Sequence, residues 1–274
     1  MEPRQKILVH AGFHKTATTT IQDYLTRNRT RLAPHLRYYG KADLPEAGTA
    51  ARKFGQRPFP WRLARFRHAL RGFLDTLDPG TPIVMSRETF AGAMPGHRQI
   101  HGRLVMDYTA VAVPLARVIV SELERRFGKD AEIVFLYTVR GRSDWLDSVH
   151  GHLLRSIRLT DDLAEFRARF PDLPRLEDQA RTIARAIAPV RVETAALEHT
   201  SLAPEGPVRP VLDLMEVPQD VRAKLKMAPR ANVGQPFDLR ATFLAINREV
   251  RDKSALKARK DALVKAHWKA LRDV

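Results

Sequence analysis

The sequence predicts an α/β fold in three layers (α/β/α), with a mainly parallel central sheet of about four or five strands. Two observations lead to this prediction. Short apolar runs of strand length alternate along the chain with longer segments in which apolar residues recur at helical spacing. The runs are also continuously apolar, which is typical of parallel strands that helices cover on both faces.

Four segments have the composition of buried strands, namely 7–9, 82–88, 132–140 and 189–193. The third is the clearest, because a long run rich in β-branched and aromatic residues follows a Gly-Lys-Asp turn. We expect it near the centre of the sheet. We predict helices after residue 18, over 63–77, 111–127, 165–170, 176–187, 239–250 and 253–274, and from residues 143 and 211.

Segments rich in Pro and Gly predict the connections. Residues 34–60 are expected to form an irregular connection, and residues 91–108 a mobile loop. Ser143 is expected to cap the helix that follows the third strand. The length of 274 residues fits one large domain, and we predict a single domain over 1–274 that ends in a basic helix, 253–274.

The composition excludes several classes of function. No cysteine is present, which excludes disulfides and thiolate chemistry, and no apolar run is long enough to span a membrane. The chain begins with charged residues and enters its first strand directly, so no signal peptide is predicted. Together these features predict a cytoplasmic protein.

The net charge of +16 favours an anionic partner, whether nucleic acid, a membrane surface or a small polyanion. Aromatic residues make up only 7% and no nucleic-acid motif occurs, so we expect no nucleic acid. Two predicted helices are basic and amphipathic, 63–77 and 253–274, and either can contact a membrane surface or simply face solvent. In the second, Lys260 is expected to lie off the apolar stripe. An oligomer contact is a further alternative.

The stretch from Lys6 to Leu25 predicts an anion site. A short strand is followed by a loop containing Gly12 and Lys15, and the loop leads directly into a helix. Backbone N–H groups and the positive end of the helix dipole converge at such a junction. Lys15 adds a cation, and four threonine hydroxyls add further donors, Thr16, Thr18, Thr19 and Thr20. We therefore predict a phosphate site.

The spacing of this loop differs from that of an NTPase loop, because no second Gly precedes Lys15. The pattern Gly12-x-x-Lys15-Thr16-x-Thr18-Thr19 instead resembles the 5′-phosphosulfate loop of the PAPS-dependent sulfotransferase family, bacterial sulfotransferases included (PAPS is 3′-phosphoadenosine-5′-phosphosulfate). The resemblance implies a P-loop-like fold and a sulfotransferase that binds PAPS through residues 12–19, including Phe13 and His14. Ala17 stands where that family usually has Gly. We expect the loop to pass this position with negative φ or to carry strain.

A second motif strengthens the resemblance. Arg140 ends the third predicted strand, and Ser148 lies about two turns into the following helix. In the family, an Arg and a Ser at these places hold the 3′-phosphate of the cofactor, a task that suits the bidentate guanidinium. Arg230, just before a late helix, resembles the basic loop that closes over the nucleotide.

Sulfuryl transfer requires charge neutralisation at the leaving phosphate and a base for the acceptor hydroxyl. Lys15 is the candidate for the first task. Glu88, at the predicted carboxyl end of a neighbouring strand, is the first candidate for the base, and His10 and His14 are the others. An ion pair between Glu88 and Arg87, or another of the many arginines, is an equally weighted alternative for that carboxylate.

The resemblance implies transfer of a sulfuryl group from PAPS to a hydroxyl or amine, with release of 3′,5′-bisphosphoadenosine (PAP) and without a metal. The acceptor, whether a small molecule, a glycan or a lipid, is not determined by the sequence. Two alternatives stay open. One is a P-loop nucleotide or small-molecule kinase, which would need a Mg²⁺-binding carboxylate at a strand end. The other is a non-catalytic protein that binds phosphate or nucleic acid, suggested by charge alone.

Overall fold

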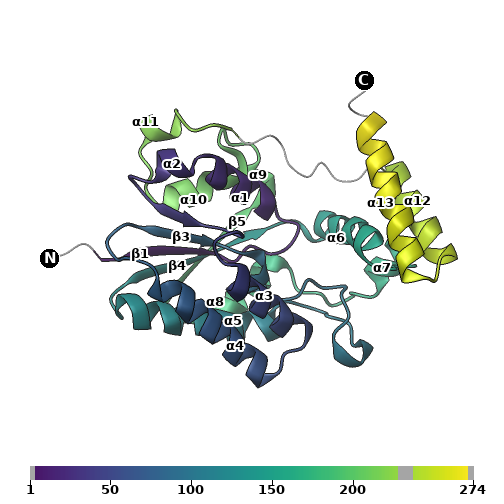
Figure 1. The fold of residues 1–274 in the computed structure, drawn as a ribbon, viewed down its shortest axis with the longest axis horizontal. Helices are drawn as coiled ribbons and strands as arrows, with labels where there is room; N and C mark the ends of the chain where they lie inside the picture. The colour runs from purple at the N-terminus through teal and green to yellow at the C-terminus, as the bar shows by residue number, and fades with distance from the viewer. Residues whose placement is uncertain (1–3, 228–236, 271–274) are drawn as a thin grey trace. The chain divides into compact units, whose positions relative to one another are not determined.

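The structure is a computed structural model that describes residues 4–227 and 237–270 (Figure 1). Its contacts divide the chain into two compact units, one formed by 1–142 with 174–232 and the other by 143–173 with 233–274. The first unit contains the sheet, and the second consists of helices. The single domain predicted over 1–274 stays a prediction. No helix of the described residues is both long enough and apolar enough to cross a membrane.

The sheet has five strands, all parallel, in the order β2-β3-β1-β4-β5. The strands are β1 (Lys6–His10), β2 (Arg37–Tyr39), β3 (Ile83–Ser86), β4 (Glu132–Val139) and β5 (Arg191–Ala196). This confirms the predicted α/β class. The last residue of β1, His10, is in register with Ser86, the last residue of β3. Both strands therefore end at one edge of the sheet.

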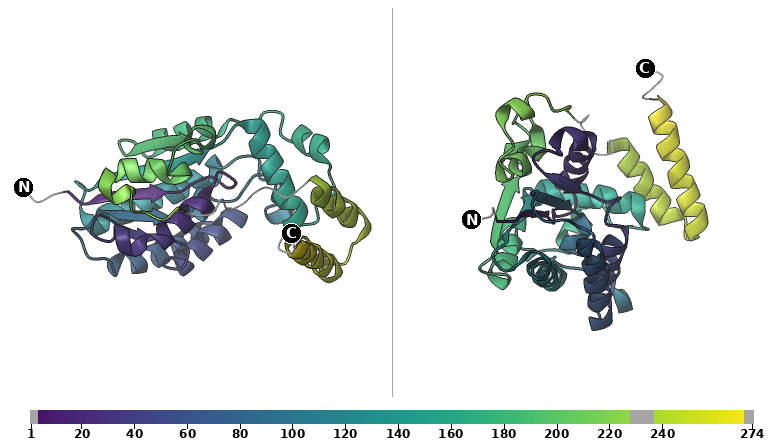
Figure 2. Two further views of the ribbon diagram at one scale, coloured as in Figure 1. Left: turned by 90° about the horizontal axis from the view of Figure 1, so that it is seen from above. Right: turned by 60° about the vertical axis from the view of Figure 1, so that its left-hand side comes forward.

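Helices cover both faces of this sheet (Figures 1 and 2). One layer holds α1 (Thr18–Arg27), α2 (Arg29–Leu32), α9 (Leu197–Thr200), α10 (Arg209–Leu214) and α11 (Gln219–Arg222). The other holds α3 (Pro45–Gln56), α4 (Pro60–Asp75), α5 (Thr109–Phe127) and α8 (Leu176–Ala186). Short 3-10 turns occur at Glu88–Ala91, Ile100–Gly102 and Gly206–Val208.

The alternation of side chains along each strand supplies both layers with a core. Leu8 and Val84 belong to a buried cluster with Ile21 and Leu25 of α1. Their neighbours on β1, Ile7 and Val9, are fully buried as well. This double burial explains why the strands are continuously apolar.

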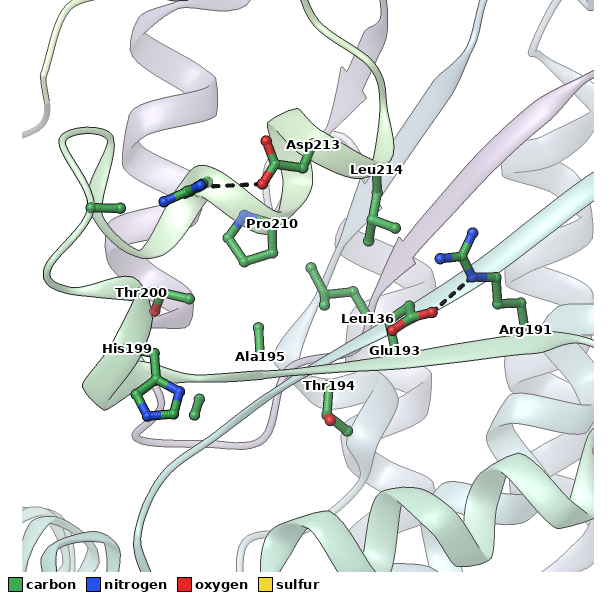
Figure 3. A pocket seen from close by; sticks show the side chains of 13 residues that line it. Leu136, Arg191, Glu193, Thr194, Ala195, His199, Thr200, Pro210, Asp213 and Leu214 are labelled. Carbon is green, nitrogen blue, oxygen red and sulfur yellow. Dashed lines mark hydrogen bonds and ion pairs between the residues drawn. The ribbon is translucent and has the colours of Figure 1, made fainter.

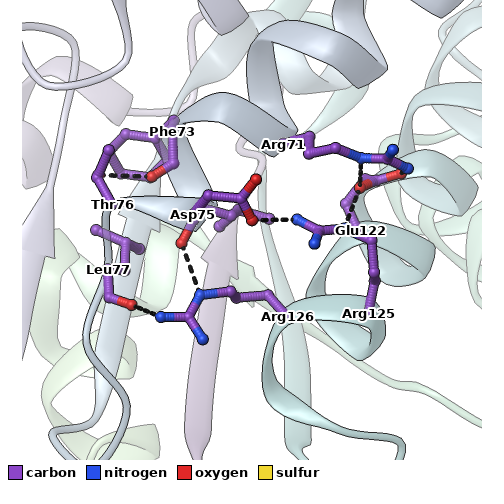
Figure 4. Close-up of polar contacts among 9 residues, drawn as sticks. Arg71, Phe73, Asp75, Thr76, Leu77, Glu122, Arg125 and Arg126 are labelled. Carbon is purple, nitrogen blue, oxygen red and sulfur yellow. Dashed lines mark hydrogen bonds and ion pairs between the residues drawn. The ribbon is translucent and has the colours of Figure 1, made fainter.

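A buried carboxylate joins α4 to α5 (Figure 4). Glu122 of α5 is only 1% exposed, and it accepts hydrogen bonds from Arg71 Nε and Nη2 at 2.9 and 3.0 Å. Arg125 Nε donates to the same carboxylate at 2.9 Å, and its Nη2 pairs with Asp75 at 2.5 Å. The hydrogen bonds from Arg71, chief among the causes, hold the pKa of Glu122 below its ordinary value.

The second unit contains α6 (Arg142–Ser156, from Ser143 on), α7 (Leu163–Ala168), α12 (Phe237–Glu249) and α13 (Lys253–Ala270). Asn247 of α12 donates to the carbonyl oxygens of Leu154 and Leu159 at 3.0 and 2.8 Å. Lys260 of α13 donates to Leu154 O and Ile157 O at 2.6 and 2.8 Å. Leu154 lies in the last turn of α6, where the helix itself supplies no donor for the carbonyl group, and Ile157 and Leu159 lie in the segment that follows.

Several local predictions were wrong. Residues 34–60, expected to be irregular, contain β2 and the whole of α3. Ser143 lies inside α6, which begins at Arg142. Lys260 is buried, 4% exposed, rather than off the apolar stripe, because its ammonium group reaches the open carbonyl end of α6. Burial lowers the pKa of Lys260 to about 8.

Candidate functional site

The candidate site lies at the edge where β1, β3 and β4 end. The loop 11–17 leaves β1 there and leads into α1, and the segment after β3 turns into the 3-10 helix that begins with Glu88. Arg87 N donates to His10 O at 3.1 Å, which holds the two exits side by side. Ligand sites of parallel sheets form at this edge.

Two residues of the loop adopt the left-handed conformation. Lys15 has φ of 67°, and Ala17 has φ of 66° with ψ of 20°. Ala17 occupies the N-cap position of α1 and provides no capping side chain. Of the two expectations for position 17, the structure therefore shows the strained one, at about 1–2 kcal/mol for an L-residue. The first N–H groups of α1 have no intrahelical acceptor, and no acidic residue occupies its first turn.

Threonine hydroxyls close the base of the loop. Thr16 is fully buried, and its hydroxyl donates to Phe13 O at 2.6 Å while lying 2.6 Å from Thr138 Oγ1 of β4. Because one hydroxyl carries one proton, Thr138 is the donor in the second bond. Gly12 fits against the same group, since a Cβ there would lie 2.8 Å from Thr138 Oγ1 and 2.6 Å from His10 Nε2.

Phe13 serves the core rather than a ligand. Its ring is fully buried, with ring centroids 4.6 Å from Tyr108 and 5.0 Å from Tyr137. Only its backbone can contribute to the predicted cofactor site. The aromatic packing fixes the inner side of the loop, and Lys15 on the same loop is partly exposed.

Glu88 accepts a hydrogen bond from the first residue of α1, with Thr18 Oγ1 3.1 Å from Glu88 Oε2. The carboxylate thus lies beside the amino end of α1, at the edge where the sequence placed it. Arg87 is 8% exposed and points to α3, where a Cβ at Gly48 would lie 1.8 Å from its Nη2. The alternative that Glu88 forms an ion pair with an arginine stays a prediction. Among the described residues, Arg87 Nε has no hydrogen-bond partner.

His10 is fully buried beneath the loop. Its Nδ1 lies 2.7 Å from Ser86 Oγ, which also accepts from Gln22 Nε2 at 3.2 Å. Burial lowers the pKa of His10 to about 4, although the Glu88 carboxylate raises it in part. The imidazole is therefore neutral at pH 7 and a weak base. Its Nε2 contacts no hydrogen-bond partner in the described part of the chain.

His14 stacks on Tyr108, with ring centroids 5.9 Å apart. Its backbone N–H donates to the Tyr108 hydroxyl at 3.2 Å, and its Nδ1 lies 3.3 Å from the same oxygen. Burial lowers the pKa of His14, partly opposed by Glu88. Tyr108 is in turn fixed by Gln179, whose Oε1 accepts from the backbone N–H of Tyr108 at 2.8 Å.

The remaining predicted residues are placed less completely. Thr19 is exposed on the first turn of α1, and Arg140 is partly buried one residue beyond β4. Ser148 lies within α6 in the second unit, so its pairing with Arg140 stays a prediction. Arg230 lies outside the described residues.

The sequence prediction missed Thr138, Tyr108, Gln22 and Ser86 as supports of the site. Two of them gave a signal, Thr138 as a polar residue inside the apolar run of β4 and Ser86 as a polar residue at the end of β3. Tyr108 lies outside the motifs, and only the fold brings it to the loop.

A hollow lies beside β5 (Figure 3). It has a volume of about 440 Å³ and is lined by β5, α9 and α10, with Leu136 of β4. Its charged side chains pair with one another, Arg191 with Glu193 at 2.8 Å and Arg209 with Asp213 at 3.4 Å. None of the predicted site residues lines it. It therefore gives no support to a reaction centre there.

The described residues contain no group of three or more His, Asp or Glu side chains placed to hold a metal ion. Comparison with models of known protein families gave no match, and neither did comparison with curated proteins. The residues at the sheet edge are therefore the basis on which a function can be inferred for this chain.

Proposed function

We propose that this protein is a PAPS-dependent sulfotransferase. The observation that carries the proposal is the junction of loop 11–17 with α1: Lys15 lies in a left-handed loop before a helix amino end, and Glu88 is hydrogen-bonded to the first residue of that helix. An anion site and a carboxylate thus share one edge of the sheet. This is the arrangement that transfer from a phosphosulfate to a hydroxyl needs.

In this reaction, the acceptor oxygen attacks sulfur while the bond between sulfur and the bridging phosphate oxygen breaks. Lys15 and the amino end of α1 stabilise the negative charge that develops on the leaving phosphate. Glu88 accepts the proton of the acceptor hydroxyl. With a hydroxyl acceptor the products are a sulfate ester and PAP. With an amine acceptor the nitrogen attacks sulfur and loses the proton to Glu88, and the products are a sulfamate and PAP. In this proposal Arg140 binds the 3′-phosphate, and a role for Ser148 beside it is what the resemblance implies.

The buried histidines have supporting roles in this proposal. His10 is fully enclosed, and a pKa of about 4 makes it a poor proton acceptor for an alcohol. It stabilises the end of β1 against Ser86 instead. His14 is less enclosed and remains the second choice for the base if Glu88 does not act.

One contact favours a sulfotransferase over a P-loop kinase. In P-loop NTPases the hydroxyl after the loop lysine binds Mg²⁺. Here the corresponding hydroxyl, Thr16 Oγ1, is buried and bonded to Phe13 O and Thr138 Oγ1. Binding a metal would require these bonds to break. Glu88 is the carboxylate that a kinase would use, so the alternative has a direct test: activity abolished by EDTA and restored by Mg²⁺ would support it.

Isothermal titration calorimetry with PAP, 5′-AMP, ATP and duplex DNA tests the proposal. We expect PAP to bind most tightly, because only PAP matches both the loop and the 3′-phosphate site. Preference for ATP in the presence of Mg²⁺ would favour the alternative of a P-loop kinase. Preference for DNA would favour the alternative of a non-catalytic protein that binds nucleic acid. Equal affinity for PAP and 5′-AMP would contradict recognition of the 3′-phosphate.

A further inference from the structure

A groove of about 660 Å³ lies between α3 and α4, and four of its lining residues are basic. These are Lys53 and Arg57 at the end of α3, and Arg62 and Arg65 at the start of α4. Glu46 is the one acidic residue among the ten that line it. The surplus of positive charge makes an anionic occupant the complementary one.

The four cations are not neutralised by the protein. Arg62 Nη1 donates to the carbonyl oxygen of Lys53 at 2.7 Å, and within the described residues none of the four forms an ion pair. Arg71, also on α4, differs from these four residues, because its guanidinium is paired with the buried carboxylate of Glu122. Like charges gathered in a concave surface repel one another, so an anion in the groove would relieve that repulsion.

The rest of the lining narrows the chemistry of the occupant. It consists of small or polar residues, Pro45, Thr49, Ala50, Gln56 and Ala69. No aromatic side chain lines the groove on which a nucleobase could stack, and no large aliphatic side chain offers the apolar anchor that a peptide helix uses. A membrane surface is flat and cannot enter a groove. An occupant with many hydroxyls and several negative charges matches what remains.

We propose that the groove between α3 and α4 binds an acidic oligosaccharide. Carboxylate or sulfate groups pair with Lys53, Arg57, Arg62 and Arg65, and sugar hydroxyls bond to Thr49 and Gln56. The opposite face of α3 packs toward the candidate site, because Gly48 contacts Arg87 there. The groove is therefore a binding site separate from the loop, and the proposal does not depend on the reaction proposed above.

Hexagalacturonate, which carries six carboxylates, is the probe, and maltohexaose is its uncharged counterpart. The groove variant is Lys53→Glu with Arg65→Glu. The matched control is Arg31→Glu with Lys129→Glu, an equal change in net charge at exposed residues elsewhere in the first unit. We expect the wild type to bind hexagalacturonate but not maltohexaose, and the groove variant to bind about tenfold more weakly at fixed salt. The control should keep most of the affinity.

Equal weakening in both variants would overturn the proposal, because net charge alone would then account for binding. Tighter binding of hexaglutamate or hexathymidylate, lost in the groove variant, would assign the groove to a peptide or nucleic acid instead. PAP affinity serves as the internal reference. If the groove variant keeps the PAP affinity of the wild type, its fold is intact. If PAP fails to bind the wild type, the proposed sulfotransferase function is refuted, but the proposal for the groove is not.

Discussion

Replacing Ala17 with Gly should stabilise the protein, although replacing an alanine with glycine inside a helix normally destabilises a protein. Ala17 has φ of 66°, a conformation that costs an L-residue about 1–2 kcal/mol and glycine almost nothing. Glycine also increases the entropy of the unfolded chain, which costs about 0.4–1 kcal/mol. The difference leaves a net gain of about 0.5–1 kcal/mol.

Ala64→Gly is the matched control, because Ala64 is exposed in the middle of α4. There the substitution should lose about 1 kcal/mol. Urea unfolding followed by circular dichroism measures both variants, and the midpoint should rise for Ala17→Gly and fall for Ala64→Gly at unchanged slope. An Ala17→Gly variant that loses as much stability as Ala64→Gly would refute the assignment of strain to position 17.

The other predictions concern the proposed reaction and the buried carboxylate of α5. Lys15→Ala should raise the barrier by about 3–4 kcal/mol, and near wild-type turnover would contradict its role. Glu88→Gln should lower turnover about 10²–10⁴-fold while PAP affinity in calorimetry stays unchanged; a loss of PAP affinity with normal turnover would make Glu88 structural. Arg140→Ala should remove much of the preference for PAP over 5′-AMP, worth about 1.5–3 kcal/mol, whereas equal weakening of both ligands would exclude it as the reader of the 3′-phosphate. Glu122→Gln should lower stability at pH 7 by about 1.5–3 kcal/mol. Since the folded pKa of Glu122 lies below its ordinary value of 4.5, this contribution is present above pH 4.5 and is lost as the pH falls through the folded pKa. A difference between variant and wild type that persists in urea titrations at pH 3 and pH 7 alike would contradict that linkage.

The parts of the fold that the sequence predicted are those with strong periodicity. β1 and β4 are continuously apolar because they are buried on both faces, and α5 is a long helix whose buried residues recur at helical spacing. β2 was missed because it has only three residues, Arg37–Tyr39, which is too short for a pattern to emerge.

α3 was missed because its glycines were taken for loop residues. Gly48 lowers helix propensity, yet it lies where the guanidinium of Arg87 leaves no room for a Cβ. Pro45 is in fact a signal for a helix start, since it occupies the first turn. Lys260 was misplaced for a related reason: a pattern counts lysine as polar, whereas the open carbonyl groups of α6 accept its ammonium in the interior.

At the candidate site, the sequence predicts which residues lie at the sheet edge but not the direction that each side chain takes. Ser86, Arg87 and Glu88 are three consecutive polar residues at the end of β3, and the sequence alone cannot say which of them meets a ligand. In the structure they diverge because the strand gives way to a 3-10 turn at Glu88. Ser86 bonds to His10, Arg87 turns toward α3, and Glu88 reaches Thr18 at the amino end of α1. Residue type makes Glu88 the base candidate, since it is the only one of the three that can accept a proton at neutral pH, and the backbone turn adds its position beside α1. Glu88→Gln therefore separates the proposed reaction from a structural role.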